Sequence, residues 1–111
     1  MKAALALGLR QELEALVHTR PSAARLARSL RVSSSTVSRT CKDVLGHSAK
    51  EVVDRRVALE AQRLLVHSSS TPVAIGKLLG FSEPTNFLKF FRRRVGVTLE
   101  AFRQPHRLQC R

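Results

Sequence analysis

The chain has 111 residues, a length that suits one domain or two very small subdomains with a modest core. Twenty Lys and Arg residues against eight Asp and Glu residues produce a net charge of +12. This charge favours a polyanionic partner, and a basic surface that only confers solubility is the plainer alternative. No stretch approaches the ~18 apolar residues of a membrane-spanning helix, and residues 3–9 are too few for a signal-peptide core. We therefore expect no membrane partner and a cytoplasmic location.

Two amphipathic helices are predicted at the start of the chain. Residues 5–18 place leucines and a valine along one side at helical spacing. This helix is expected to end before Pro21, since the residue preceding a proline disfavours the helical region. Ser22 is suited to cap a second, short helix over residues 23–30.

A third helix is predicted after the turn formed by Arg31 and Val32. The hydroxyl residues 33–36 form a cluster that is common at helix starts, and Gly46 is suited to end the helix after about Leu45. The side chains expected to face inward from this helix are Val37, Cys41 and Val44.

The longest helix is predicted over residues 49–66. Ser48 and Glu51 have the spacing of a capping box, in which each residue satisfies a backbone N–H at the helix start. About 18 residues at ~1.5 Å each span ~27 Å, which is comparable to the ~34 Å between successive major-groove faces of B-DNA. The apolar face expected on this helix comprises Val52, Val53, Val57, Ala61, Leu64 and Leu65.

The remaining residues predict three shorter helices. Thr71 followed by Pro72 indicates a helix start, and residues 73–79 form the helix body. Ser82 is suited to cap the next helix, which carries Pro84 in its first turn and ends at Gly96 after Val95. Thr98 then caps a last helix from Leu99 to about Gln104, and a basic tail follows. The residues expected to bury together here are Leu79, Phe81, Phe87, Phe91 and Phe102.

An internal repeat supports this layout. The first half of each copy aligns at an offset of 49 and the second half at an offset of 50, so one extra residue falls in the second turn. The matched pairs are Leu26/Ile75, Ala27/Gly76, Leu30/Leu79, Val32/Phe81, Val37/Phe87, Arg39/Lys89, Cys41/Phe91, Lys42/Arg92, Gly46/Gly96 and Ser48/Thr98.

The predicted fold is therefore all-α, with about seven helices. Two helix-turn-helix subdomains are joined by a long central helix, and the whole chain 1–111 is expected to form a single DNA-binding domain. The expected parts are the N-terminal subdomain 5–46, the connecting helix 48–66, the C-terminal subdomain 71–104 and the basic tail 105–111.

The stretch 80–103 resembles the signature of AraC/XylS-type bacterial transcription regulators. The residues that carry the resemblance are Gly80, Phe81, Phe87, Phe91, Gly96, Thr98, Phe102 and Arg103, and it extends over about residues 9–103. The chain departs from the family pattern at Gly76, Lys89 and Leu99, where alanine, arginine and proline are frequent. The resemblance implies a DNA-binding domain that family members usually join to an N-terminal sensing or dimerising domain, which we expect to be absent from this chain.

Candidate DNA contacts lie at the starts and outer faces of the third and sixth helices, residues 34–45 and 83–95. A cationic helix on an apolar base suits the major groove. Arg39 is the best candidate for a bidentate contact with guanine, and Lys89 for a weaker one. Arg103 and Arg94 are expected to be phosphate ligands or surface charge. The full candidate set is Ser33, Ser34, Ser35, Ser38, Arg39, Lys42, Ser82, Pro84, Thr85, Leu88, Lys89, Arg92 and Arg93.

No pattern indicates catalysis, a cofactor or a metal site. The chain has no nucleophile elbow, phosphate loop or pair of metal ligands on one helix. The four histidines are scattered, and the spacing of Cys41 and Cys110 suits neither a metal site nor a disulfide framework. Asp54 and Glu60 are expected on a solvated helix face. We therefore expect a protein that is not an enzyme.

Three functions remain open. The first is a sequence-specific regulator that binds double-stranded DNA in the nucleoid and reads two successive major-groove segments as a monomer. The second is a non-specific architectural DNA-binding protein, distinguished by a low ratio of specific to non-specific affinity. The third is an interaction module whose basic face contacts RNA polymerase, which a pull-down without DNA would detect.

Overall fold

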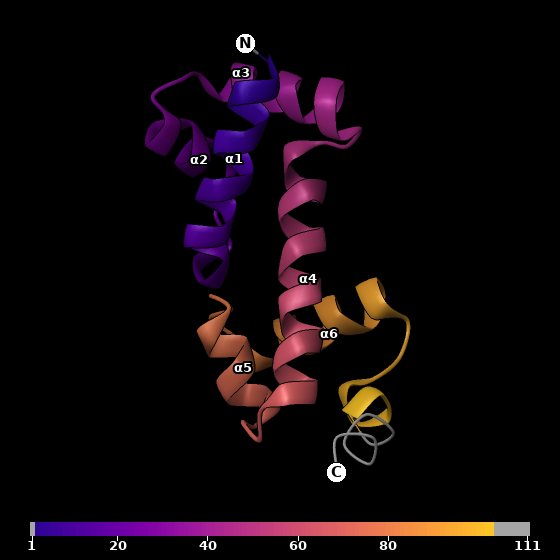
Figure 1. The fold of residues 1–111 in the computed structure, drawn as a ribbon. Helices are drawn as coiled ribbons and strands as arrows, with labels where there is room; N and C mark the ends of the chain where they lie inside the picture. The colour runs from indigo at the N-terminus through magenta and orange to yellow at the C-terminus, as the bar shows by residue number, and fades with distance from the viewer. Residues whose placement is uncertain (1, 104–111) are drawn as a thin grey trace. The chain divides into compact units, whose positions relative to one another are not determined.

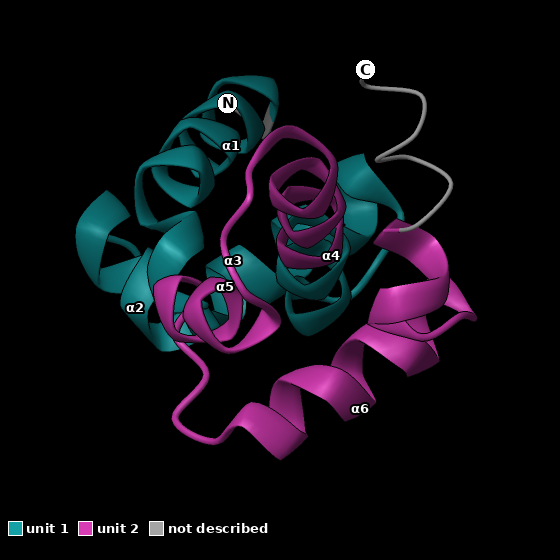
Figure 2. Ribbon diagram, turned by 90° about the horizontal axis from the view of Figure 1, so that it is seen from below, with its two compact units in different colours: residues 1–56 teal, residues 57–111 magenta. Residues whose placement is uncertain are grey.

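The computed structural model describes residues 2–103, and this part of the chain consists of helices and turns with no strand. It divides into two compact units, residues 1–56 and 57–111, and the boundary falls within the longest helix (Figure 2). The all-α fold with two helix-turn-helix motifs is confirmed. The elements are α1 Lys2–Leu16, η1 Val17–Thr19, α2 Ala23–Leu30, α3 Ser34–Thr40, η2 Cys41–Leu45, α4 Ala49–His67, α5 Pro72–Leu78 and α6 Pro84–Val95. Figure 1 labels the α-helices.

Helix boundaries follow the capping residues closely. Ser22, Ser33 and Thr71 each accept a hydrogen bond from a backbone N–H three residues ahead, at the start of α2, α3 and α5. Ser48 does the same at the start of α4, with its Oγ 3.2 Å from the Glu51 nitrogen. The first helix differs from its prediction, because α1 begins at Lys2 and passes at Val17 into the 3₁₀ turn η1.

The chain then continues beyond α6 into one more helical stretch, residues 99–103. Gly96 ends α6 with φ 91°, a left-handed conformation, and Thr98 Oγ1 accepts a hydrogen bond from the Ala101 nitrogen at 3.2 Å. Both features were predicted from the sequence. Gln104 and the tail 105–111 lie outside the described residues.

The internal repeat is present in the backbone itself. The Val32 nitrogen donates to the Ala27 carbonyl at 3.0 Å, and the Phe81 nitrogen donates to the Gly76 carbonyl at 2.9 Å, an offset of 49. After the two turns the offset becomes 50, because α3 is capped at Ser33 and α6 at Glu83. Ser82 is therefore the extra residue in the second turn.

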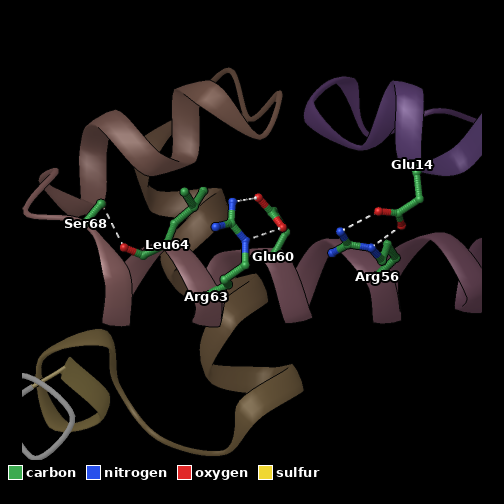
Figure 3. Close-up of polar contacts among 6 residues, drawn as sticks. All are labelled: Glu14, Arg56, Glu60, Arg63, Leu64 and Ser68. Atoms are coloured by element: carbon green, nitrogen blue, oxygen red, sulfur yellow. Dashed lines mark hydrogen bonds and ion pairs between the residues drawn. The ribbon is translucent and has the colours of Figure 1, made fainter. Parts of the chain in front are cut away.

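In the first unit, α1 packs against α2 and α3 (Figure 1). The buried side chains come from these three helices, from η1 and η2, and from α4. Arg56 on α4 donates two hydrogen bonds to the Glu14 carboxylate on α1, the one from Nη2 being 2.8 Å long (Figure 3). The buried apolar side chains of this unit are Ala6, Leu9, Leu13, Val17, Leu26, Ala27, Val37, Cys41, Ala49 and Val53.

In the second unit, phenylalanine rings form a continuous cluster. Phe81 lies 5.2 Å from Phe87 and 5.1 Å from Phe90 between ring centroids, Phe87 contacts Phe91, and Phe91 contacts Phe102 edge to face at 5.6 Å. Four of these rings are buried, and Phe102 is half-buried. The predicted cluster is present, with Phe90 as a member that the sequence pattern did not assign.

The third predicted helix is not uniform, and this corrects one core assignment. From Cys41 to Leu45 the backbone forms the π-helical turn η2, in which the Gly46 nitrogen donates to the Cys41 carbonyl five residues earlier. A π-turn adds a residue to the helical turn and shifts the angular position of the side chains that follow. Val44, expected to face inward, is 44% exposed, whereas Val37 and Cys41 are buried.

Candidate nucleic-acid interface

The helix α3 has one buried side and one exposed polar side. Val37 and Thr40 are buried, and they hold α3 against the rest of its unit. The candidate contact residues of this motif lie on the other side or at the helix start. All of them are exposed: Ser33, Ser34, Ser35, Ser38, Arg39 and, in η2, Lys42.

The Ser33 hydroxyl has a structural role that the other serines do not share. It accepts a hydrogen bond from the Thr36 nitrogen at 3.1 Å and lies 2.8 Å from Thr36 Oγ1. Because one hydroxyl satisfies the helix start, Ser34 and Ser35 are the better candidates for an external contact.

The helix α6 repeats this arrangement with larger side chains. Phe87, Phe90 and Phe91 are buried on one side. The exposed candidates of the second motif are Ser82, Pro84, Thr85, Leu88, Lys89, Arg92 and Arg93. The structure therefore brings the candidates together as two exposed faces, one in each unit.

The start of α6 differs from the prediction. The capping position belongs to Glu83 rather than Ser82, and no side chain accepts a hydrogen bond there. The extra residue in the second turn moves the cap one position along the chain. Pro84 occupies the first turn, as expected.

A partly open groove of about 230 Å³ borders the exposed face of α6. The acidic residue Glu100 lines this groove together with two of the candidate cations, which the sequence did not indicate. The lining residues are Leu88, Lys89, Arg92, Thr98, Leu99 and Glu100.

Arg103 does not have the role expected from sequence. Its Nε donates to the Leu65 carbonyl oxygen at 3.1 Å, and its Nη2 donates to the Ser68 carbonyl oxygen at 3.0 Å. Ser68 in turn donates from Oγ to the Leu64 carbonyl oxygen (Figure 3). The guanidinium therefore satisfies carbonyl groups at the end of α4, where a helix lacks internal partners, and we remove Arg103 from the candidate phosphate ligands.

Two carboxylates expected on a solvated face are buried. Asp54 is 4% exposed and accepts a hydrogen bond from Lys50 Nζ at 3.1 Å. Glu60 is 3% exposed and accepts hydrogen bonds from the Arg63 guanidinium (Figure 3). Both cations lie on the same helix as their carboxylates, three or four residues away, so the carboxylates are paired structural groups.

Within residues 2–103, the remaining chemistry-bearing groups show no reactive arrangement. Cys41 is buried, and this burial raises the pKa of its thiol. Residues 2–103 contain no group of three His, Cys, Asp or Glu side chains that could hold a metal ion. No helix in the same residues is long and apolar enough to cross a membrane.

Comparison with known proteins identifies the family. A family model described as a helix-turn-helix domain matches residues 26–105, which contain both repeated motifs. The chain belongs to the AraC/XylS family of helix-turn-helix proteins. The HTH-type transcriptional regulator VqsM of Pseudomonas aeruginosa is 34% identical over 100 residues, which are 86% of this chain but 30% of that protein.

Two solved structures have a similar fold. The DNA-binding domain of AdpA, a global transcriptional factor solved in complex with a target DNA, is 27% identical. It has a TM-score of 0.82 and the match covers 95% of this chain and 94% of that one. The C-terminal domain of the response regulator yesN from Fusobacterium nucleatum is 19% identical, with a TM-score of 0.83 and coverage of 92% and 99%.

Proposed function

We propose that this chain is a sequence-specific DNA-binding module of a transcription regulator, and that α3–η2 and α6 read two successive major-groove segments. The observation that carries the proposal is the repeated motif, in which each copy buries one side of its second helix and exposes cations and hydroxyls on the other. The DNA-bound AdpA domain and the regulator VqsM support it by similarity.

The positive charge is divided equally between the two units. Residues 1–56 contain eleven Lys and Arg and five Asp and Glu, and residues 57–111 contain nine and three, so each unit has a net charge of +6. A single anchoring surface would concentrate the charge in one unit. The equal division is what we expect if both motifs approach a phosphate backbone.

The proposed roles follow from side-chain chemistry. Arg39 and Lys89 are equivalent in the repeat, exposed, and without an ion pair in the described residues. The planar Arg39 guanidinium suits the O6 and N7 atoms of guanine, and Lys89 provides a single donor to the same edge. Pro84 and Leu88 offer apolar contact to a thymine methyl group, and Arg93 is assigned to phosphate.

The test begins with selection of bound duplexes from a random library. Affinity for the selected site and a scrambled duplex is then measured at several salt concentrations for the wild type, Arg39→Ala, Lys89→Ala and Arg93→Ala. We expect Arg39→Ala to lose ~1–3 kcal/mol of binding free energy for the selected site and to bind the scrambled duplex as the wild type does. Lys89→Ala should lose less, and Arg93→Ala should weaken both duplexes alike.

The alternative outcome is an architectural protein. If selection enriches no sequence, or if Arg39→Ala weakens both duplexes equally, base reading by α3 is excluded and non-specific binding is favoured. If the wild type binds neither duplex, the proposed function itself is wrong.

A further inference from the structure

The turn between α2 and α3 contains a strained residue. Arg31 has φ 58° and ψ 42°, which is the left-handed region, and its nitrogen donates to the carbonyl oxygens of Ala27 and Arg28 at the end of α2. A residue with a side chain costs free energy in this conformation because Cβ approaches the following carbonyl oxygen, whereas glycine does not.

The repeat shows that the turn itself does not require arginine. The equivalent residue in the second motif is Gly80, with φ 87°. The residue after each turn closes the same backbone hydrogen bond, Val32 to Ala27 and Phe81 to Gly76. Glycine therefore serves the same backbone path, and the arginine side chain at the first turn is an addition at some cost in stability.

The Arg31 side chain also has no task inside the fold. It is exposed, and it makes no hydrogen bond, ion pair or ring contact within residues 2–103. The chain has no acidic residue between Glu14 and Asp43, so no nearby carboxylate in the sequence neutralises it. Arg28 is one turn earlier on α2, is also exposed and is likewise without a partner in this part of the chain.

We infer that Arg31 is a phosphate-binding residue of the DNA interface, placed by the turn immediately before the start of α3. Strained residues that persist without an internal role are often retained for an interaction outside the chain. A guanidinium two residues before Ser33 is in position to pair with the phosphate that flanks a helix start entering the major groove. The inference rests on the proposed function, and it makes the two motifs unequal, because the second has Gly80 at this position.

The test uses Arg31→Gly, Arg31→Lys and the control Arg20→Gly. Arg20 is also an arginine in the left-handed region, with φ 49°, but it follows η1 and lies outside the helix-turn-helix. Affinity for the selected and scrambled duplexes is measured against salt, and a urea denaturation of each variant is recorded in parallel.

We expect Arg31→Gly to weaken both duplexes by about three- to tenfold and to make the slope of log K against log salt shallower by ~0.9. Its denaturation midpoint should be no lower than that of the wild type. Arg31→Lys should keep the slope, because it keeps the charge, and Arg20→Gly should change the slope by less than half as much.

Two outcomes would overturn the inference while leaving DNA binding intact. One is an unchanged slope for Arg31→Gly, and the other is an equal loss for Arg31→Gly and Arg20→Gly, which would be a general effect of net charge. Failure of the wild type to bind either duplex would instead refute the proposed function.

Discussion

Arg103 Nε donates a hydrogen bond to the carbonyl oxygen of Leu65, 3.1 Å away and 38 residues earlier in the chain. Together with the bond from Nη2 to Ser68, this contact closes the C-terminal end of α4 with a cation, which also suits the negative end of the helix dipole. Arg103 therefore connects the helix after α6 to α4 within the second unit, and its effect should appear in folding.

Replacing Arg103 should destabilise the second unit. Arg103→Ala leaves two part-buried carbonyl groups without these donors, and we expect a loss of ~2–3 kcal/mol in the free energy of unfolding measured with urea. Arg93→Ala, which removes an exposed arginine, is the matched control and should stay within ~0.5 kcal/mol. An equal effect of the two substitutions would contradict the capping role.

Two glycines inside helices should respond in opposite directions. A Cβ atom at Gly8 would lie 3.5 Å from Leu30 Cδ2, which is an ordinary contact. Gly8→Ala should therefore raise the free energy of unfolding by ~0.5–1 kcal/mol, because alanine has the higher helix propensity. A Cβ at Gly76 would lie 3.0–3.1 Å from Phe87, so Gly76→Val should force α5 away from α6 and cost ~1–3 kcal/mol. Chemical denaturation of both variants checks this, and a stabilising Gly76→Val would show that the contact relaxes freely.

The start of α6 should be open to improvement by a capping residue. Glu83 occupies the position equivalent to Ser33 but provides no side-chain cap. Glu83→Ser should place a hydroxyl near the Asn86 nitrogen and raise the free energy of unfolding by ~0.5–1 kcal/mol. Ser33→Ala should lower the free energy of unfolding by ~1 kcal/mol, because it removes such a cap. Thermal unfolding followed by circular dichroism is the measurement; a neutral Glu83→Ser variant would indicate that the extra residue in the turn prevents cap geometry.

Phe91 should dominate the stability of the second unit. Its side chain is 0% exposed and contacts the rings of Phe87 and Phe102. We expect Phe91→Ala to cost ~3–5 kcal/mol, whereas Leu88→Ala, at a side chain that is 44% exposed, should cost much less. Comparable urea midpoints for the two variants would refute the placement of Phe91 in the core.

Cys41 should make stability fall at alkaline pH. Burial raises the pKa of its thiol above the ordinary value of 9.0, so the folded chain keeps a proton that the unfolded chain releases. The stabilisation is complete well below that value and is lost as pH rises from it through the higher pKa of the folded chain. In a Cys110→Ser background, the free energy of unfolding should decline as pH rises beyond about 9, and adding Cys41→Ala should remove that part of the decline. Parallel profiles for the two variants would refute the assignment.

The sequence by itself determined the features that depend on neighbouring residues. The caps at Ser22, Ser33, Thr71 and Thr98 are local hydrogen bonds between a hydroxyl and an N–H three residues ahead, and their residue types indicate them directly. The left-handed glycines that end η2 and α6 are equally local. The repeat was visible because both copies bury side chains at the same spacing, and from it the two motifs and the all-α fold followed.

Only the tertiary structure decided the features that depend on helical phase or on distant partners. The π-turn η2 rotates Val44 out of the core, and the extra residue Ser82 moves the cap to Glu83. Asp54 and Glu60 are buried in the folded chain, whereas a sequence pattern shows only their polarity. The sequence does not distinguish Arg103 from the other arginines, because its hydrogen bonds to the carbonyl groups of Leu65 and Ser68 join residues more than thirty positions apart.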